Sequence, residues 1–390
     1  MKKKVAALIT TYYPASHADV IVTKFLKGFP TDDGLRESRV EVASLYLDQI
    51  HERDVGVALA KQHEVPIYPS ITAALSLGGS ELAVDGVLII GEHGDYAWNE
   101  KEQHLYPRRY FFEQVCGVLA RSGRSIPVFS DKHLSWSWEH ARWMYDRALE
   151  LEVPFMAGSS LPISYRRPWL EYELETPLQE ALSMAYGGLD SYGFHALETL
   201  QCMAERRVGG ETGVSAVQCL EGEAVWAAGA EGRWSAELFD AALEHIEARD
   251  EGDVREHCDK PTVYLLEHTD GLQTATFLLN GFLSGWGYAG RVDGDVAGCE
   301  VYLHGDPHPH FSYLGLNAEE MIVTGKPVYP VERTLLVSGM LEALLTSRHQ
   351  GHVRLETPHL EVSYQSYHSE PVRPRCGRPT GAAAVPWRLE

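Results

Sequence analysis

The nine residues AVDGVLIIG, at positions 83–91, form an apolar run that ends at a glycine. An apolar run of this length with little polar alternation is typical of a strand buried on both faces of a parallel sheet. The next segment, RRYFFEQVCGVLARSG at 108–123, has apolar residues at helical spacing, and SIPVFSD at 125–131 is again strand-like. Strands and helices that alternate with short links predict a doubly wound parallel sheet.

The same alternation runs through residues 1–158, which we predict to form the first domain. Beyond it the pattern changes, and PTVYLLEHTDGLQTATFLLNGF, at 261–282, predicts two long strands around an Asp-Gly turn. Residues 159–364 are therefore predicted to form an α+β domain with a mainly antiparallel sheet, and the fold class is α/β. The remaining residues, 365–390, are rich in proline, arginine and glycine and predict a loose C-terminal tail.

The composition narrows the classes of partner. The 34 lysine and arginine residues against 55 aspartate and glutamate residues give a net charge of −21. This charge argues against nucleic acid as a partner, because nucleic-acid affinity rests on clustered cations. No apolar stretch approaches the ~18 residues that predict a transmembrane helix, and the run VAALI, at 5–9, is too short for a signal-peptide core. We therefore expect no membrane partner and a cytoplasmic protein.

The turn after the first strand contains no glycine. It lies within LITTYYPASHADVIV, at 8–22, where a strand–turn–helix that binds a dinucleotide would carry a glycine-rich loop, and the first glycine of the chain is Gly28. Glycine lets the backbone approach the pyrophosphate closely, whereas a tyrosine at position 12 is expected to narrow or fill that space. Hydroxyl groups and the amides of a helix start remain as phosphate contacts, and an acidic residue that ends the second strand would bond the ribose. The candidate dinucleotide contacts are Thr10, Thr11, Tyr12, Ser16, His17 and Asp48.

Four segments, in order, resemble the Gfo/Idh/MocA family of sugar oxidoreductases. They are VDGVLIIGEHGDY (84–96), the stretch from GRSIPVFSDKH to FMAGSS (123–160), GGLDSYGFHALETL (187–200) and MIVTGKPVYPVERTLLVSGMLEALLTSR (321–348). The likeness covers about residues 4–364. It implies an N-terminal Rossmann-like domain, a second domain that carries the substrate, and a homodimer or homotetramer paired through the open face of the second domain's sheet.

The resemblance also implies site residues. Lys132, in SDKH, matches the lysine of the family's Glu-Lys-Pro motif, which bonds the reacting hydroxyl, and His195, in SYGFHALE, matches the catalytic histidine. The acid that usually precedes this histidine by four residues is replaced by Ser191, so Asp190 is the candidate orienting acid. The implied function is an NAD(P)-dependent oxidoreductase, with NAD or NADP as cofactor, that acts on a hydroxyl of a small polyhydroxylated substrate: a sugar, sugar derivative or polyol.

A second hypothesis comes from the residue types alone. His93 and Asp95 form a His-x-Asp pair, and Asp131 and His133 are expected across the same cleft. Imidazole and carboxylate groups suit divalent metals such as zinc, manganese or iron. This set predicts a metal site and an alternative function, in which the fold serves a metal-assisted lyase, hydrolase or isomerase without nicotinamide turnover. A non-catalytic sensor or scaffold is a third alternative.

Overall fold

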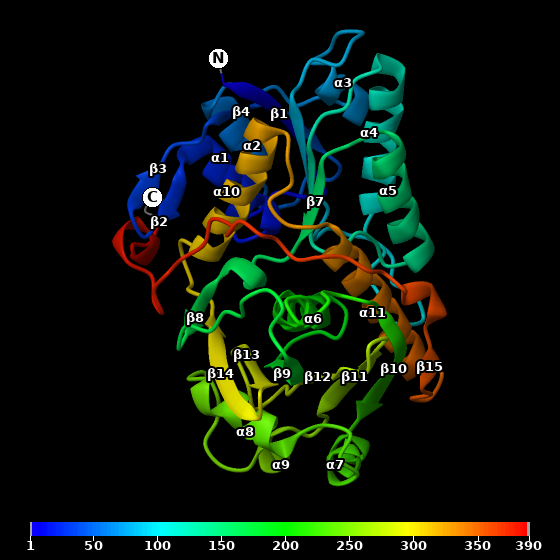
Figure 1. Cartoon of the computed structure of the whole chain (residues 1–390). Coiled ribbons are helices and arrows are strands. Elements are labelled where there is room, and N and C mark those ends of the chain that lie inside the picture. The colour runs from blue at the N-terminus through cyan, green and yellow to red at the C-terminus, as the bar shows by residue number, and fades with distance from the viewer. Residues whose placement is uncertain (1, 388–390) are drawn as a thin grey trace.

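The computed structural model describes residues 2–387, and its N-terminal half contains a five-stranded parallel sheet (Figure 1). The strand order is β4-β1-β5-β6-β7, and every neighbouring pair is parallel. The strands are β1 (Lys3–Ile9), β4 (Val40–Leu47), β5 (Gly86–Ile90), β6 (Val128–Asp131) and β7 (Phe155–Gly158). The predicted doubly wound parallel sheet is confirmed, and residues 86–90 of the apolar run at 83–91 form its central strand.

Helices cover both faces of this sheet because its strands are apolar on both sides. In β1, Val5, Ala7 and Ile9 belong to one hydrophobic core, and Ala6 and Leu8 belong to another. The first core is covered by α1 (His17–Lys27), α2 (Gly56–Gln62) and α10 (Pro309–Thr324), and the second by α3 (Ile71–Leu75), α4 (Arg108–Ser122) and α5 (Trp138–Glu150). Helix α10 lies far along the chain, so the first domain is not built from residues 1–158 alone.

The second sheet has eight strands in the order β15-β10-β11-β12-β9-β13-β14-β8. Within the described residues, neighbouring strands are antiparallel except for the pair β12 and β9. The strands are β8 (Tyr165–Arg167), β9 (Leu178–Ala185), β10 (Val214–Glu221), β11 (Thr262–His268), β12 (Gln273–Leu278), β13 (Gly287–Val292), β14 (Asp295–Tyr302) and β15 (Leu355–Glu356). The mainly antiparallel sheet is confirmed, and β11 and β12 flank the predicted Asp-Gly turn.

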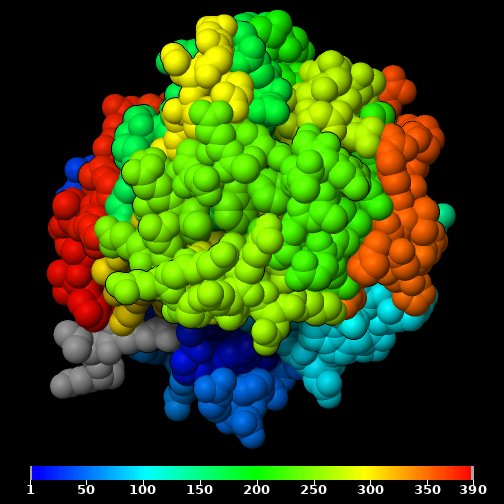
Figure 2. All heavy atoms as spheres, turned by 90° about the horizontal axis from the view of Figure 1, so that it is seen from below, coloured from blue at the N-terminus to red at the C-terminus, as the bar shows by residue number. Residues whose placement is uncertain are grey.

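Helices also cover both faces of the second sheet. Helices α6 (Ser191–Ala204) and α11 (Glu332–His349) lie between this sheet and the first domain, whereas α7 (Glu223–Ala230), α8 (Ala236–His245) and α9 (Val254–His257) lie on its outer face (Figure 1). On the outer face, Leu182 and Phe277 of the sheet share a core with Trp226 and Phe239 of the helices. Figure 2, which looks onto this side, shows the green to yellow-green atoms of this part of the chain at the surface.

This covered face changes the expectation for assembly. A homodimer or homotetramer was expected because an open apolar sheet face is rarely left exposed by a monomer, but the chain's own helices bury that face. We therefore expect a monomer in solution. Light scattering at micromolar concentration measures the molar mass directly, and a mass of two or four chains would show that another surface pairs.

The C-terminal segment is packed rather than loose. Arg373 is buried, and its Nη1 lies 2.8 Å from Glu171 Oε2. The amide of Val372 donates to Asn317 Oδ1 of α10 at 2.9 Å. The predicted loose tail is therefore wrong for residues 365–387, because a buried ion pair and hydrogen bonds hold them, and its last residues, 388–390, lie outside the described part.

The remaining elements are short. A hairpin of β2 (Phe29–Thr31) and β3 (Gly34–Arg36) follows α1, and three 3-10 helices are η1 (Leu161–Ile163), η2 (Pro358–Leu360) and η3 (Gly381–Ala384). Among the described residues, no helix has the length and apolar character needed to cross a membrane.

Candidate functional site

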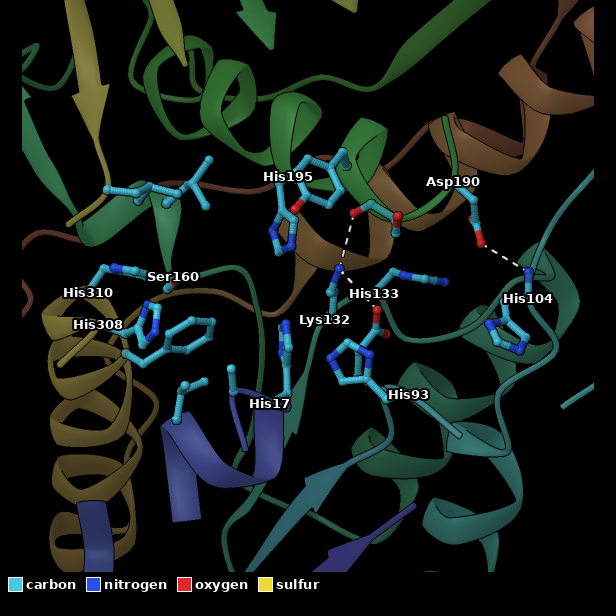
Figure 3. A pocket seen from close by; sticks show the side chains of 18 of the residues that line it. His17, His93, His104, Lys132, His133, Ser160, Asp190, His195, His308 and His310 are labelled. Carbon is cyan, nitrogen blue, oxygen red and sulfur yellow. Dashed lines mark hydrogen bonds and ion pairs between the residues drawn. The ribbon is translucent and has the colours of Figure 1, made fainter. Parts of the chain in front are cut away.

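A cavity of about 410 Å³ lies between the two domains (Figure 3). Its walls come from the loops after β5, β6 and β7 and from the starts of α1, α6 and α10. The carboxyl ends of parallel strands meet at one edge of a sheet, which is where ligands bind in such folds. Seven histidines line the cavity: His17, His93, His104, His133, His195, His308 and His310.

Lys132 is held rigidly at the end of β6. Its backbone is in the left-handed region, with φ +71°, and its side chain is buried. The Lys132 ammonium donates to the carbonyl of Ser191 at 3.1 Å and lies 3.3 Å from Glu92 Oε1. Burial alone would raise the pKa of Glu92, but Lys132 and Arg108 lower it well below its usual value. Glu92 is therefore a carboxylate that fixes the Lys132 cation at the cavity wall.

His195 is the fifth residue of α6, one turn after Ser191, whose carbonyl Lys132 bonds. Its Nδ1 is 2.6 Å from the hydroxyl oxygen of Ser159, a residue that directly follows β7. Burial, reinforced by the charges of Lys132 and His17, lowers the pKa of His195 well below its usual value. The imidazole is therefore neutral, and the contact with Ser159 leaves Nε2 for a ligand in the cavity. The structure brings Lys132 and His195 into one cavity.

Asp190 does not orient His195. Its Oδ2 accepts a hydrogen bond from the amide of His104 at 3.1 Å, and its Oδ1 is buried without a hydrogen-bond partner among the described residues. The group that orients His195 is Ser159, which the sequence analysis missed. The only available signal was a serine placed directly after a predicted strand. Burial raises the pKa of Asp190 to about 6, so its carboxyl group changes charge near neutral pH.

Replacing Asp190 with asparagine is expected to stabilise the fold above pH 6. The folded state raises this pKa from 3.8 to about 6, so above pH 6 it carries the full cost of a buried carboxylate. That cost disappears as the pH falls through 6 towards 4, because the folded state then binds a proton. Urea unfolding at pH 8 should show a gain of up to about 3 kcal/mol for Asp190→Asn.

This gain should shrink towards zero near pH 4. Asp95 is exposed and does not line the cavity, so Asp95→Asn is the control and should leave the free energy of unfolding at pH 8 unchanged. An Asp190→Asn protein no more stable than the wild type at pH 8 would contradict the assignment.

The glycine-free turn satisfies its own amides. Ser16 caps α1, and its hydroxyl oxygen accepts from the amides of Asp19 at 3.3 Å and Tyr13 at 3.1 Å. The carboxylate of Asp19 accepts from the amide of Ala15 at 2.7 Å. Three amides of the turn and helix start, those of Tyr13, Ala15 and Asp19, therefore bond to side chains of the chain, and the Asp19 carboxyl group lies at the start of the helix, where an anion would bind. These residues do not fit a pyrophosphate bound in the usual manner.

Thr10 and Asp48, two other candidate dinucleotide contacts, are also engaged. The Thr10 hydroxyl donates to the carbonyl of Glu92 at 2.8 Å, whereas the buried Thr11 hydroxyl has no hydrogen-bond partner among the described residues. Asp48 directly follows β4, but its two carboxylate oxygens accept from the hydroxyls of Tyr46 and Tyr96, each at 2.7 Å. A ribose at this position would have to compete with two tyrosines.

Tyr12 does not fill the space of a pyrophosphate. Its side chain is completely buried in the core beneath the turn, and its hydroxyl lies 2.7 Å from that of Thr23 on α1. A Cβ atom at Gly56, the first residue of α2, would lie 2.7 Å from Tyr12 Cδ1. The expectation that Tyr12 meets a ligand is therefore wrong, because its ring packs between two helices.

The predicted metal site is not assembled. Asp131 bonds to His17, with 2.6 Å between its Oδ2 and His17 Nδ1, and His133 Nε2 lies 3.0 Å from the guanidinium of Arg108. Asp95 is exposed and does not line the cavity. Burial lowers the pKa of His93 to about 4. Across residues 2–387, no three His, Cys, Asp or Glu side chains are grouped so that they could hold a metal ion. The prediction of a metal ligand set from His93, Asp95, Asp131 and His133 is wrong.

Comparisons with known proteins identify the fold. No protein-family model matches the chain, and no curated protein sequence matches it. Among solved structures, GenD2 from gentamicin A biosynthesis, in complex with NAD, superposes with a TM-score of 0.57 at 15% identity, over 91% of this chain and 96% of the other. The chain has the fold of the Gfo/Idh/MocA-type dehydrogenases.

Two inositol dehydrogenases from Lactobacillus casei share this Gfo/Idh/MocA-type fold. The myo-inositol enzyme, in complex with NAD(H) and myo-inositol, has a TM-score of 0.56 at 11% identity, over 91% of this chain and 97% of the other. The scyllo-inositol enzyme, with NAD(H) and scyllo-inositol bound, has a TM-score of 0.56 at 9% identity, over 91% and 99% of the two chains. Similarity at this level of identity establishes the shared architecture and leaves the chemistry to the residues of the cavity.

Proposed function

We propose that the chain is an enzyme that transfers protons at a hydroxylated carbon of a sugar or sugar derivative, with Lys132 and His195 as the proton-transfer groups. The observation that carries this proposal is the position of both side chains at the start of α6, inside one cavity. Neutral imidazoles both donate and accept hydrogen bonds, which suits a ligand rich in hydroxyls. The parallel rings of Tyr192 and Trp286, 5.5 Å apart, add an apolar surface for a sugar face.

The two groups have complementary roles. His195 is neutral, so its Nε2 accepts a proton from the substrate, and Ser159 holds the ring by its other nitrogen. The Lys132 ammonium is a donor fixed between Glu92 and the carbonyl of Ser191, and it stabilises negative charge that develops on a substrate oxygen. Together they supply one base and one cation on the same wall of the cavity.

The glycine-free turn before α1 bonds its amides to its own side chains, which favours a reaction that needs no dinucleotide. Ser16 and Asp19 bond three amides at the place where a dinucleotide fold holds its pyrophosphate. An isomerisation or epimerisation beside a carbonyl group fits this site, because the C–H proton passes to a base and the same or another carbon is protonated in return. The substrate class is then a sugar or sugar derivative that carries a carbonyl or carboxylate next to the hydroxylated carbon.

A second candidate is NAD(P)-dependent oxidation of a polyol or sugar hydroxyl. The fold shared with three structures that contain NAD or NAD(H) favours it, as does the acid Asp48 at the end of β4. The hydrogen bonds from amides of the glycine-free turn to Ser16 and Asp19 weigh against this second candidate.

Proton exchange separates the two candidates. The protein is incubated in D₂O with a panel of keto sugars, sugar acids and polyols, alone and with NAD or NADP. Deuterium entering carbon-bound positions, seen by NMR without nucleotide, supports acid–base chemistry. Reduced nucleotide formed without such exchange supports the second candidate and overturns the first. No exchange and no reduction across the panel would reject both.

A further inference from the structure

Helix α10 begins at the wall of the cavity between the two domains. It has 16 residues, no described side chain caps its start by a hydrogen bond, and its first turn contains no acidic residue. Its first residue, Pro309, has no N–H group, and the amide of Phe311 donates to the carbonyl of His308 at 3.0 Å. The amide of His310 is therefore the first N–H group at the positive end of this helix.

Two buried polar atoms lie beside this helix start. Among residues 2–387, neither Ser160 Oγ nor His310 Nδ1 has a hydrogen-bond partner, although the two residues are only 1% and 5% exposed. Both residues line the cavity, and Figure 3 shows them beside His308 at one end of it. Since buried polar atoms are nearly always hydrogen-bonded, these two atoms indicate that a ligand completes this end of the cavity.

The surroundings of this end favour negative charge. Nζ of Lys24, a buried lysine of α1, donates to the carbonyl of Pro307, just before α10, at 2.9 Å. Burial, reinforced by basic neighbours that include Lys24, lowers the pKa of His310 well below its usual value, so its imidazole is neutral. Asp306, the acid that precedes the helix, does not line the cavity, and Asp190 lies at the other end (Figure 3).

We propose that Ser160, His310 and the start of α10 form a subsite that binds an anionic group of the substrate, a carboxylate or a phosphate. The Ser160 hydroxyl, His310 Nδ1–H and the His310 amide are its donors. Anionic oxygens only accept hydrogen bonds, and they bind at helix starts because the amide groups and the helix dipole are both favourable there. The role as a substrate subsite rests on the proposed function.

The subsite lies in the same cavity as the proton-transfer groups. Phe311, the residue after His310, contacts His17 with 5.1 Å between ring centroids, and the rings of His17 and His195 are 6.4 Å apart in the same measure. A sugar anchored by its anionic group at α10 therefore extends past His17 towards Lys132 and His195. The substrate class is a sugar acid or sugar phosphate whose anionic group is remote from the reacting carbon.

The experiment uses three sugars that differ only at carbon 6: D-glucose, D-glucuronate and D-glucose 6-phosphate. In calorimetric titrations of the wild type, one or both anionic sugars should bind at least ~10-fold more tightly than glucose, because bonds to a charged group are strong. Tighter binding of the glucuronate assigns the subsite to carboxylates, and tighter binding of the phosphate assigns it to phosphates. Ser160→Ala and, as a second variant, His310→Leu should each reduce the affinity for the preferred anion about 10-fold and leave that for glucose unchanged.

The matched control is Ser312→Ala. Ser312 carries another buried hydroxyl without a partner among the described residues, two positions after His310, but it does not line the cavity, so all three affinities should stay unchanged. Equal affinities of the wild type for the three sugars, no binding of any of them, or wild-type anion affinity in both folded variants would overturn the inference. Deuterium exchange on the same sugars tests the proposed function separately: anion-selective binding that Ser160→Ala weakens, without exchange in any sugar, would overturn that function and leave an anion site.

Discussion

Replacing Lys132 with methionine is expected to lower turnover by about 100- to 10,000-fold, which is the usual loss for a positioned proton-transfer group. Methionine keeps the length of the side chain and removes the charge that would face a developing oxyanion. Glu92 keeps the guanidinium of Arg108 as its partner, so the variant does not strand a buried carboxylate. The rate of deuterium exchange into substrate, followed by NMR, measures the loss.

The control for this variant is Lys61→Met. Lys61 is an exposed lysine of α2, away from the cavity, and its replacement should leave the exchange rate unchanged. Unfolding curves for both variants establish that the comparison is between folded proteins. Turnover within a few-fold of the wild type in folded Lys132→Met would remove Lys132 from the mechanism.

Replacing Tyr12 with glycine is expected to reduce the free energy of unfolding by about 3–5 kcal/mol, as for other buried aromatic residues cut back to small ones. The Tyr12 ring is fully buried against Gly56, and the glycine would leave a cavity between α1 and α2. Tyr12→Phe keeps the ring and removes the hydrogen bond to Thr23, worth about 1 kcal/mol. Urea unfolding of the two variants measures both effects.

The same two proteins test where Tyr12 points. If the side chain filled a nucleotide pocket, Tyr12→Gly would bind NAD or NADP more tightly and lose little stability. We expect no gain in calorimetric titrations with either nucleotide. Tighter nucleotide binding together with wild-type stability would place Tyr12 in the cleft and contradict the structure.

Local patterns predicted most of the fold. The apolar run at 83–91 and the helical spacing at 108–123 gave the correct elements, because burial on both faces of a strand and on one face of a helix leaves a periodic signal. The turn between β11 and β12 was predicted from its Asp-Gly pair for the same local reason. The return of α10 to the first sheet left no local signal, since it depends on contacts between segments far apart in the chain.

The site was less predictable, because its decisive contacts are long-range. His17 and Asp131 are 114 residues apart and were assigned separately to a cofactor and a metal. Ser159 and His195 are 36 residues apart, and no spacing rule connects them. The direction of the Tyr12 side chain depends on the backbone of the turn, where Ala15 has φ +66°, and residue type does not report that angle.

The late position of α10 has a consequence for synthesis. A ribosome releases the strands of the first sheet well before residues 309–324, and until then Val5 and Ile322 cannot meet across the core that they share. We expect the nascent chain to carry an uncovered apolar surface and to engage chaperones through it. For the same reason, residues 1–158 expressed alone should be poorly soluble, whereas a fusion of that segment to 309–324 through a flexible linker should recover soluble material.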